Sequence, residues 1–199
     1  MSLLIESIKL LDGEFYNLFY HEQRINKSLK ELCGIDEHSD LERFLKKLNY
    51  PDKGLYKCRI IYDDTRKEIE FVPYTPRPIQ SLKIVENNRV RYDHKYNDRR
   101  TLDKLYAMRG ECDDILIVKD NLVTDTYYCN IVFRRNSKWY TPWSTLLAGT
   151  MRQSLIDKGV IEVEMITKDD INSFSSCKLI NAMLGFDGPE IETSAIILS

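Results

Sequence analysis

The pattern of apolar and polar residues predicts that the chain opens with two antiparallel strands. Asp12-Gly13 lies between two alternating segments and readily adopts the positive φ angles of a tight hairpin turn. A second pair of segments, rich in aromatic and β-branched residues, predicts another hairpin. The predicted strands are residues 3–11, 14–18, 55–62 and 68–72.

Apolar residues at helical spacing predict two helices between these hairpins. The first covers residues 20–33 and is closed by Gly34, because glycine readily ends a helix in the left-handed conformation. Ser39 is expected to cap a second helix over residues 41–48. Helices and hairpins together predict a small α+β lobe.

Three prolines in residues 73–78 prevent this segment from continuing a helix or a central strand. We therefore predict an N-terminal lobe over residues 1–76 and a C-terminal lobe over residues 77–199. The second lobe mixes short strands with helices. Its predicted strands are residues 82–86, 114–119, 122–124, 129–134, 138–140, 161–166 and 178–183, and its predicted helices are residues 101–109, 150–158 and 169–174.

Composition excludes several classes of function. The 29 basic and 31 acidic residues nearly cancel and form no basic stripe, so nucleic acid is not an expected partner. No apolar run could span a bilayer, and Glu6 and Lys9 interrupt any signal peptide, so we expect a cytoplasmic protein without a membrane partner. Five cysteines without a CxxC pair and three scattered histidines predict neither a disulfide framework nor a metal site.

Three features could carry chemistry, although each has a plainer interpretation. Gly149 precedes a helix whose first amides, at Thr150 and Met151, would form an anion site; alone it is an ordinary loop entering a surface helix. Lys95 lies between a strand and a helix, and alone it is a solvated lysine. Asp125 closes a strand, and alone it caps or turns the chain.

Taken together, these residues resemble the class IV aminotransferase family, which includes branched-chain and D-amino acid aminotransferases and aminodeoxychorismate lyases. The matching motifs keep the family's order over nearly the whole chain. Gly-x-Met-Arg-Gln and Asn-Ala-Met favour the lyase branch. The motifs are Leu4-Ile5-Glu6-Ser7-Ile8, His21-Glu22-Gln23-Arg24, Lys95-Tyr96-Asn97-Asp98-Arg99, Val123-Thr124-Asp125 with Asn130, Tyr140-Thr141-Pro142, Gly149-Thr150-Met151-Arg152-Gln153 and Ile180-Asn181-Ala182-Met183.

The resemblance implies an α+β fold of two small lobes, an N-terminal α/β sandwich and a C-terminal pseudo-barrel, with pyridoxal 5'-phosphate (PLP) as cofactor. It implies that Lys95 binds the cofactor covalently and then acts as general base and acid. Asp125 would face the pyridine nitrogen, where the family usually has a glutamate. The shorter side chain is either accommodated by a small backbone shift or weakens the cofactor's capacity to accept electrons.

Further cofactor contacts follow from the same resemblance. Arg24 matches the family's phosphate-binding arginine and would hold an anion together with the amides of Thr150 and Met151; the alternative is a surface arginine on a helix. Leu147 would pack near the ring face. Asn181 and Ala182 match the loop close to the phosphate.

The N-terminus departs from the family, because only residues 1–3 precede the matching strand. We therefore expect the substrate-facing residues that this region normally supplies to be missing. Arg59, on the strand over residues 55–62, becomes a candidate for binding a substrate carboxylate. The alternative is a structural pair with Glu68 or Glu70 across the hairpin.

Three functions remain open. The first is aminodeoxychorismate lyase, an enzyme of folate biosynthesis that forms 4-aminobenzoate and pyruvate without an amino acceptor. The second is an amino acid aminotransferase, and the third is a non-catalytic PLP-binding or scaffold protein. The resemblance implies a small-molecule amino substrate and a homodimer.

Overall fold

The computed structural model describes residues 2–36 and 40–197, which form two compact units. The first unit contains residues 1–76 and 94–98, and the second contains residues 77–93 and 99–199. The lobes predicted as residues 1–76 and 77–199 differ from these units at residues 94–98. The difference arises because this short segment pairs with the first strand of the chain.

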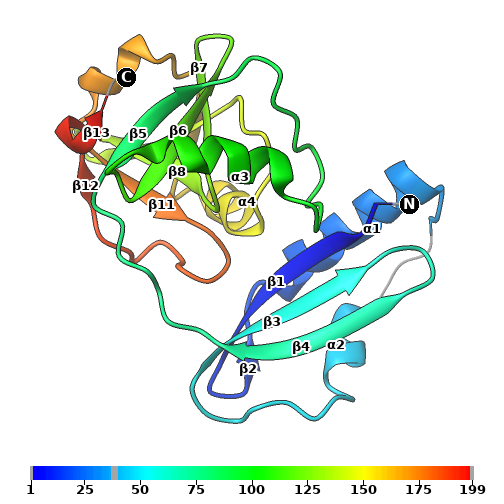
Figure 1. The fold of residues 1–199 in the computed structure, drawn as a ribbon. Coiled ribbons are helices and arrows are strands. Elements are labelled where there is room, and N and C mark those ends of the chain that lie inside the picture. Colours follow the sequence, from blue (N-terminus) through cyan, green and yellow to red (C-terminus); the bar gives the residue numbers. More distant parts are fainter. Residues whose placement is uncertain (1, 37–39, 198–199) are drawn as a thin grey trace. The chain divides into compact units, whose positions relative to one another are not determined.

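The described part of the first unit contains a four-stranded sheet in the order β2-β1-β3-β4, whose neighbouring strands are antiparallel (Figure 1). Buried side chains of β1, β3 and both helices form one apolar core, so the helices cover one face of the sheet. Its elements are β1 (Leu4–Leu11), β2 (Glu14–Phe15), α1 (Leu18–Cys33), α2 (Leu41–Leu45), β3 (Leu55–Tyr62) and β4 (Lys67–Pro73).

Local signals place most of these elements correctly. Asp12 and Gly13 have φ angles of 48° and 82°, which confirms the predicted turn. Strand β2 ends earlier than predicted because α1 already begins at Leu18. The predicted cap Ser39 lies outside the described residues, and Asp40 caps α2 by accepting a hydrogen bond from the Arg43 amide at 2.9 Å.

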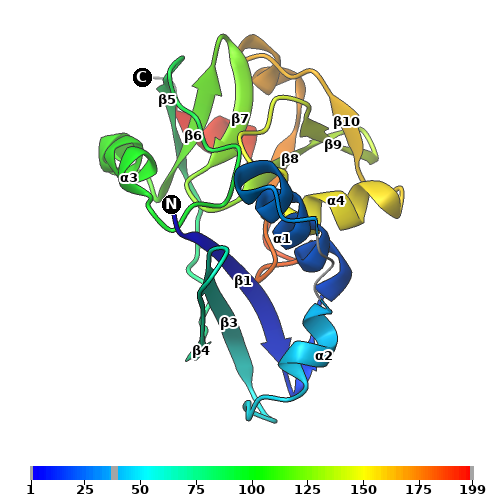
Figure 2. The ribbon, with the colours of Figure 1, turned by 90° about the vertical axis from the view of Figure 1, so that its right-hand side faces the viewer.

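The second unit contains a larger, mixed sheet in the order β10-β9-β8-β7-β6-β5-β13, with β11 paired to β8 and β12 paired to β11 (Figures 1 and 2). Side chains from β5 to β8 and from β11 form its largest apolar core. Its strands are β5 (Leu82–Glu86), β6 (Asp114–Lys119), β7 (Leu122–Thr126), β8 (Asn130–Arg135), β9 (Lys138–Pro142), β10 (Glu162–Glu164), β11 (Ser176–Ile180), β12 (Ile191–Glu192) and β13 (Ile196–Ile197). Its helices are α3 (Arg100–Tyr106), η1 (Ala107–Arg109), α4 (Thr150–Asp157), η2 (Asp169–Ser173) and η3 (Thr193–Ala195).

Strand β8 is the branch point of this sheet. It pairs with β7, β9 and β11 among the described strands. At its start, Asn130 lies opposite Asp125 of β7 and opposite Ile180 of β11. The branch therefore brings the ends of β7, β8 and β11 together.

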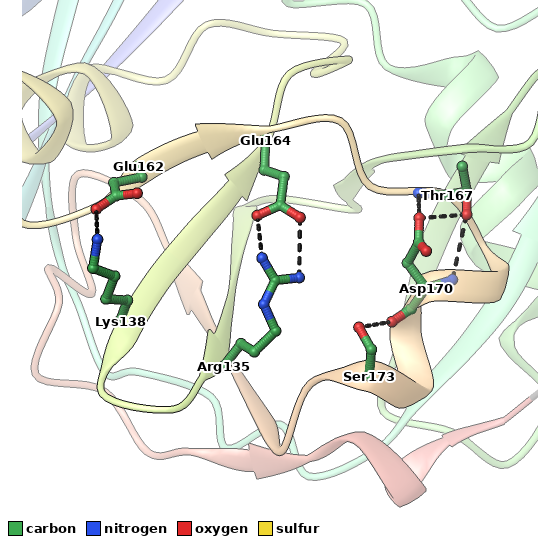
Figure 3. Close-up of polar contacts among 7 residues, drawn as sticks. All are labelled: Arg135, Lys138, Glu162, Glu164, Thr167, Asp170 and Ser173. Atoms are coloured by element: carbon green, nitrogen blue, oxygen red, sulfur yellow. Dashed lines mark hydrogen bonds and ion pairs between the residues drawn. The ribbon is translucent and has the colours of Figure 1, made fainter.

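Ion pairs reinforce the edge of the sheet where β10 pairs in parallel with β9 (Figure 3). Arg135 donates to both carboxylate oxygens of Glu164, at 3.0 and 2.7 Å, and Lys138 donates to Glu162 at 2.8 Å. These contacts connect the β8–β9 hairpin to a strand that follows more than twenty residues later. They are a structural feature of the unit, and none involves a residue predicted for the cofactor.

The second unit differs from the predictions in one strand boundary and in two additional short strands. The strand predicted over residues 178–183 begins and ends earlier, as β11, because residues 181–185 turn away from the sheet through side-chain and backbone hydrogen bonds of Asn181. Strands β12 and β13 were not predicted. Each contains only two residues, too few for a periodic signal.

Candidate cofactor-binding site

The backbone that carries Lys95 is fixed within the first unit. The Lys95 carbonyl oxygen accepts a hydrogen bond from the Ile5 amide at 2.9 Å, and the Asn97 amide donates to the Leu3 carbonyl at 2.8 Å. Residues 95–97 therefore run beside β1. The Lys95 side chain itself is half-buried.

A buried ionic cluster lies next to this segment. Glu6 of β1 accepts hydrogen bonds from Arg24 Nε and Nη2 of α1, at 2.7 and 2.6 Å. His21 Nδ1 lies 2.7 Å from Glu6 Oε2, a distance that suits an N–H donor. Glu6 and His21 are fully buried, and the Arg24 side chain is 12% exposed. Because His21 and Arg24 are three residues apart, they project from the same side of α1.

Electrostatics explains why this cluster is stable inside the unit. Burial raises the pKa of Glu6, but the charge of Arg24 and the hydrogen bond from His21 outweigh it and hold the pKa well below its usual range. Burial lowers the pKa of His21, and the positive charges of Arg24 and Lys95 act in the same direction. Glu6 is therefore ionised and His21 neutral at pH 7, and His21 responds to the charge of Lys95.

Glu6 and His21 were part of the matching motifs but received no predicted role. A signal was present in the sequence. Glu6 alternates with Leu4 and Ile8 on the buried face of β1, a position where an unpaired charge would be very costly. A carboxylate there predicts a buried cationic partner, which the structure identifies as Arg24.

In the second unit, Asp125 is held from two sides. Its Oδ1 accepts a hydrogen bond from Asn130 Nδ2 at 2.7 Å, and its Oδ2 accepts one from the Leu147 amide at 2.9 Å. Asn130 Nδ2 also donates to the Leu147 carbonyl oxygen at 2.9 Å. Asp125 is 6% exposed. The predicted residues Asp125 and Leu147 therefore lie together, with Asn130 between them.

Burial raises the pKa of Asp125 to about 6, although the bonds from Leu147 and Asn130 and the charge of Arg152 oppose this shift. Arg152 is also buried, and its Nε and Nη2 donate to Thr141 Oγ1 at 3.1 Å and to the Pro142 carbonyl at 2.9 Å. At pH 7 Asp125 is thus mostly a carboxylate, close enough to Arg152 for each to influence the other's pKa.

Helix α4 begins where the resemblance predicts. Gly149 is its N-cap residue and has no side chain, so the cap itself contributes no hydrogen bond from a side chain. Thr150 is buried and Met151 is half-buried in the first turn. Helix geometry directs the amides of a first turn towards the preceding loop, where an anion is favoured by their partial positive charge. Thr150 and Met151 therefore lie where an anion would be stabilised.

Asn181 and Ala182 follow β11 and lie beside the same region. Asn181 Nδ2 donates to Cys129 Sγ at 3.2 Å, and its Oδ1 accepts the amides of Met183 and Leu184 at 2.9 Å. Since Cys129 immediately precedes Asn130, this loop is connected to the Asp125 cluster. Asn181 serves as a local turn former in addition to any role towards a ligand.

Arg59 forms a structural ion pair across its hairpin, as the alternative to substrate binding predicted. Its Nη1 donates to Glu70 at 2.6 Å across the β3–β4 hairpin, which confirms that interpretation for Glu70. Its Nη2 donates to Asn97 at 3.2 Å, two residues after Lys95. A substrate role for Arg59 stays a prediction.

The predicted residues thus form a group in each unit. Lys95 and Arg24 belong to the first unit, and Asp125, Leu147 and the start of α4 belong to the second. Each group contains residue types that the family resemblance predicts: a half-buried lysine beside an ionic cluster in the first unit, and a buried carboxylate joined to a helix start in the second. Comparison with known proteins identifies the family.

The family model for class IV aminotransferases matches residues 3–186. An uncharacterized protein of Haemophilus influenzae is 35% identical over 184 residues, which cover 92% of this chain and 98% of the relative. The chain belongs to the class IV aminotransferase family. A Schizosaccharomyces pombe protein, provisionally named aminodeoxychorismate lyase, is 30% identical over 87% of this chain and 83% of its own length.

Solved structures agree with this assignment. A crystal structure from Haemophilus somnus, provisionally named 4-amino-4-deoxychorismate lyase, has a TM-score of 0.88 and 32% identity over 94% of this chain and 98% of its own. A structure from Mesorhizobium loti, named as an amino-acid aminotransferase, has a TM-score of 0.79 and 19% identity over the whole of both chains. The predicted class IV aminotransferase-like α+β fold is therefore confirmed.

No helix in the described part of the chain combines the length and the apolar character that a membrane span requires. Nor do residues 2–36 and 40–197 contain three or more His, Cys, Asp or Glu side chains grouped so as to hold a metal ion.

Proposed function

We propose that this protein is a PLP-dependent aminodeoxychorismate lyase, which converts its amino substrate to 4-aminobenzoate and pyruvate. The supporting observation is the similarity, over almost the full length of both chains, to the Haemophilus somnus structure that carries this provisional name. The Schizosaccharomyces pombe relative has the corresponding name. The Gly149-Thr150-Met151-Arg152-Gln153 motif supports the same branch of the family.

The predicted site residues have the chemical groups that PLP binding requires. Asp125 is a buried carboxylate with a hydrogen bond to each oxygen, a suitable partner for a protonated ring nitrogen. Gly149 allows the Asn130 side chain to pack against the start of α4, because a Cβ there would lie 1.9 Å from Asn130 Oδ1. Thr150 and Met151 offer amides to a phosphate, and Arg24 offers a guanidinium already oriented by Glu6.

In the proposed reaction PLP, when bound, would supply the electron sink that a substrate carbanion requires. Lys95 would hold the cofactor and would remove the proton from the ring carbon that bears the substrate nitrogen. Cleavage of the ether bond would then make the ring aromatic and release the enolate of pyruvate, which takes up the proton from Lys95 to give pyruvate. Asp125, as a carboxylate, stabilises positive charge at the ring nitrogen.

A non-catalytic scaffold explains these features less well. A buried carboxylate whose pKa is raised to about 6 reduces stability at neutral pH. A scaffold would gain nothing from that cost, whereas a cofactor site requires a carboxylate at this position. The proposal also includes a homodimer, as the family resemblance implies, and a cytoplasmic location, as the sequence predicts. Light scattering after gel filtration would check the dimer.

Covalent attachment of PLP provides the test. Purified protein is incubated with PLP, reduced with borohydride and digested, and the modified peptide is identified by mass spectrometry. We expect the label on Lys95 and its loss in Lys95→Ala. Lys104→Ala, which changes an exposed lysine of α3, is the matched control and should remain labelled. An unlabelled wild-type protein would overturn the PLP proposal and favour the scaffold.

A second experiment separates lyase from aminotransferase. The lyase releases pyruvate from aminodeoxychorismate without any α-keto acid. An aminotransferase instead converts PLP to its amine form when given an amino donor alone, which absorbance detects. Stoichiometric conversion with amino acids and no pyruvate release would replace the lyase with the aminotransferase.

A further inference from the structure

The Asn130 side chain connects three positions of the proposed cofactor site. Its Nδ2 donates to Asp125 Oδ1 at 2.7 Å and to the Leu147 carbonyl at 2.9 Å. Its Oδ1 lies against Gly149, where a Cβ would come within 1.9 Å of that oxygen. One carboxamide thus contacts the carboxylate, the loop before α4 and the N-cap of α4.

The chemistry of these contacts requires a carboxamide. Both acceptors, a carboxylate oxygen and a carbonyl oxygen, need donors, and the NH₂ group supplies two hydrogens from one atom. The Leu147 amide holds the other oxygen of Asp125 at 2.9 Å. Rotation of the Asp125 carboxylate would break a hydrogen bond in a buried environment, where an unpaired polar group is costly.

The charged neighbour of Asp125 does not set this direction. Arg152, on α4, contributes its charge, but its guanidinium donates hydrogen bonds to Thr141 and Pro142 of β9. Arg152 therefore affects how readily Asp125 ionises, and Asn130 and Leu147 determine where its oxygens point.

We infer that Asn130 is a positioning residue that fixes the direction of the Asp125 carboxylate and its geometry relative to the start of α4. The inference rests on the proposed function, in which Asp125 faces the ring nitrogen and the start of α4 holds the phosphate. The two ends of the cofactor would then be aligned by one side chain that does not touch the reacting atoms.

Asn130→Asp tests this with almost no change in shape. Two carboxyl groups 2.7 Å apart cannot both be ionised easily, so they share one proton at low pH. That proton restores the hydrogen bond between the two side chains, while the bond to the Leu147 carbonyl is lost at every pH. As the pH rises the proton is lost and the groups repel each other. We expect PLP affinity within about threefold of wild type near pH 6 and at least about tenfold weaker near pH 8.5.

A readout without cofactor comes from thermal unfolding of the apo protein over the same pH range. The shared proton raises the folded-state pKa of the pair above its unfolded value, so its stabilisation is lost as the pH rises. The unfolding midpoint of Asn130→Asp is compared with that of wild type at each pH. We expect the difference between them to be about 5 °C larger at pH 8.5 than at pH 6. Asn88→Asp, an exposed change that keeps its bond to the Asp120 amide, should show no such trend.

Gly149→Ala provides an independent variant, since its new Cβ forces Asn130 to move. It should weaken PLP binding at every pH without adding a charge. The inference would be overturned if Asn130→Asp lost the same PLP affinity at both pH values. It would also be overturned if Gly149→Ala bound PLP with wild-type affinity. Wild type that fails to bind PLP would refute the proposed function, whereas the pH-dependent loss in the apo protein would still uphold the contact between Asn130 and Asp125.

Discussion

Glu6 receives both hydrogen bonds from the Nε–Nη2 edge of Arg24, at 2.7 and 2.6 Å, inside the core of the first unit. This side-on geometry fixes the orientation of the guanidinium through two of its five N–H groups. Arg24 therefore has a structural role within the first unit.

Glu6→Gln should destabilise the protein by about 3 kcal/mol, because it leaves Arg24 partly buried without its counter-charge. Urea unfolding of the apo protein at pH 7 measures this value. Glu70→Gln is the matched control, since Glu70 pairs with Arg59 on the exposed side of β4 and should cost less than about 1 kcal/mol. Equal costs for the two variants would contradict the buried ion pair.

Acid should destabilise the first unit through the titration of Glu6 and of His21. The folded-state pKa of Glu6 is lowered, so its contribution is present at neutral pH and lost as the pH falls below about 4.5. The pKa of His21 is lowered as well, so the unfolded chain takes up a proton below about 6.5 that the folded protein does not. His21→Asn should reduce the loss of unfolding free energy between pH 7 and pH 5. An unchanged slope would show that another group titrates there.

Asp125 should have the opposite pH dependence. Its folded-state pKa of about 6 lies above the unfolded value of 3.8, so ionisation costs stability as the pH rises through this range. The difference corresponds to about 3 kcal/mol at most. Asp125→Asn removes this pH-dependent cost, but its NH2 group would face one of the two N–H donors of Asp125, which costs about 1–3 kcal/mol at every pH. The unfolding free energy of apo Asp125→Asn relative to apo wild type should therefore be higher at pH 8 than at pH 4.5, while PLP affinity falls. Thermal unfolding of both proteins at the two pH values measures this difference. An equal difference at both pH values would refute the prediction.

Asp125→Glu would restore the residue that the family usually has. Both oxygens of Asp125 are already bonded at 2.7 and 2.9 Å, so an added methylene group overpacks the site by about 1–3 kcal/mol. We expect lower stability and weaker PLP binding. Asp157→Glu, at the exposed end of α4, is the control. Tighter binding by Asp125→Glu would show that the shorter side chain weakens the site.

Arg59→Gln separates the substrate role from the structural one. Loss of its exposed pair with Glu70 should cost less than about 1 kcal/mol. If Arg59 also binds the substrate carboxylate, KM should rise about tenfold with little change in kcat. Arg66→Gln, which removes another exposed pair of the same hairpin, should leave both constants unchanged. An unchanged KM for Arg59→Gln would leave only the structural pair.

The sequence by itself determined the elements whose signals are local. Alternation placed β1 and β3, the turn at Asp12-Gly13 followed from dihedral preference, and Gly34 ended α1. The order of the motifs was sufficient to identify the family. Each short motif alone is uninformative, but the whole set in the family's order is specific.

Tertiary structure decided which distant residues meet. The return of residues 94–98 to β1, the pairing of β13 with β5, and the hydrogen bonds that join Asp125 to Asn130 and Leu147 involve groups far apart in the chain or hidden by burial. Hydrogen-bond direction and desolvation depend on the surroundings of a side chain in three dimensions. For that reason the sequence predicted Arg24 and Asp125 as ligands, but only the fold assigned Glu6 and Asn130 as the residues that hold them.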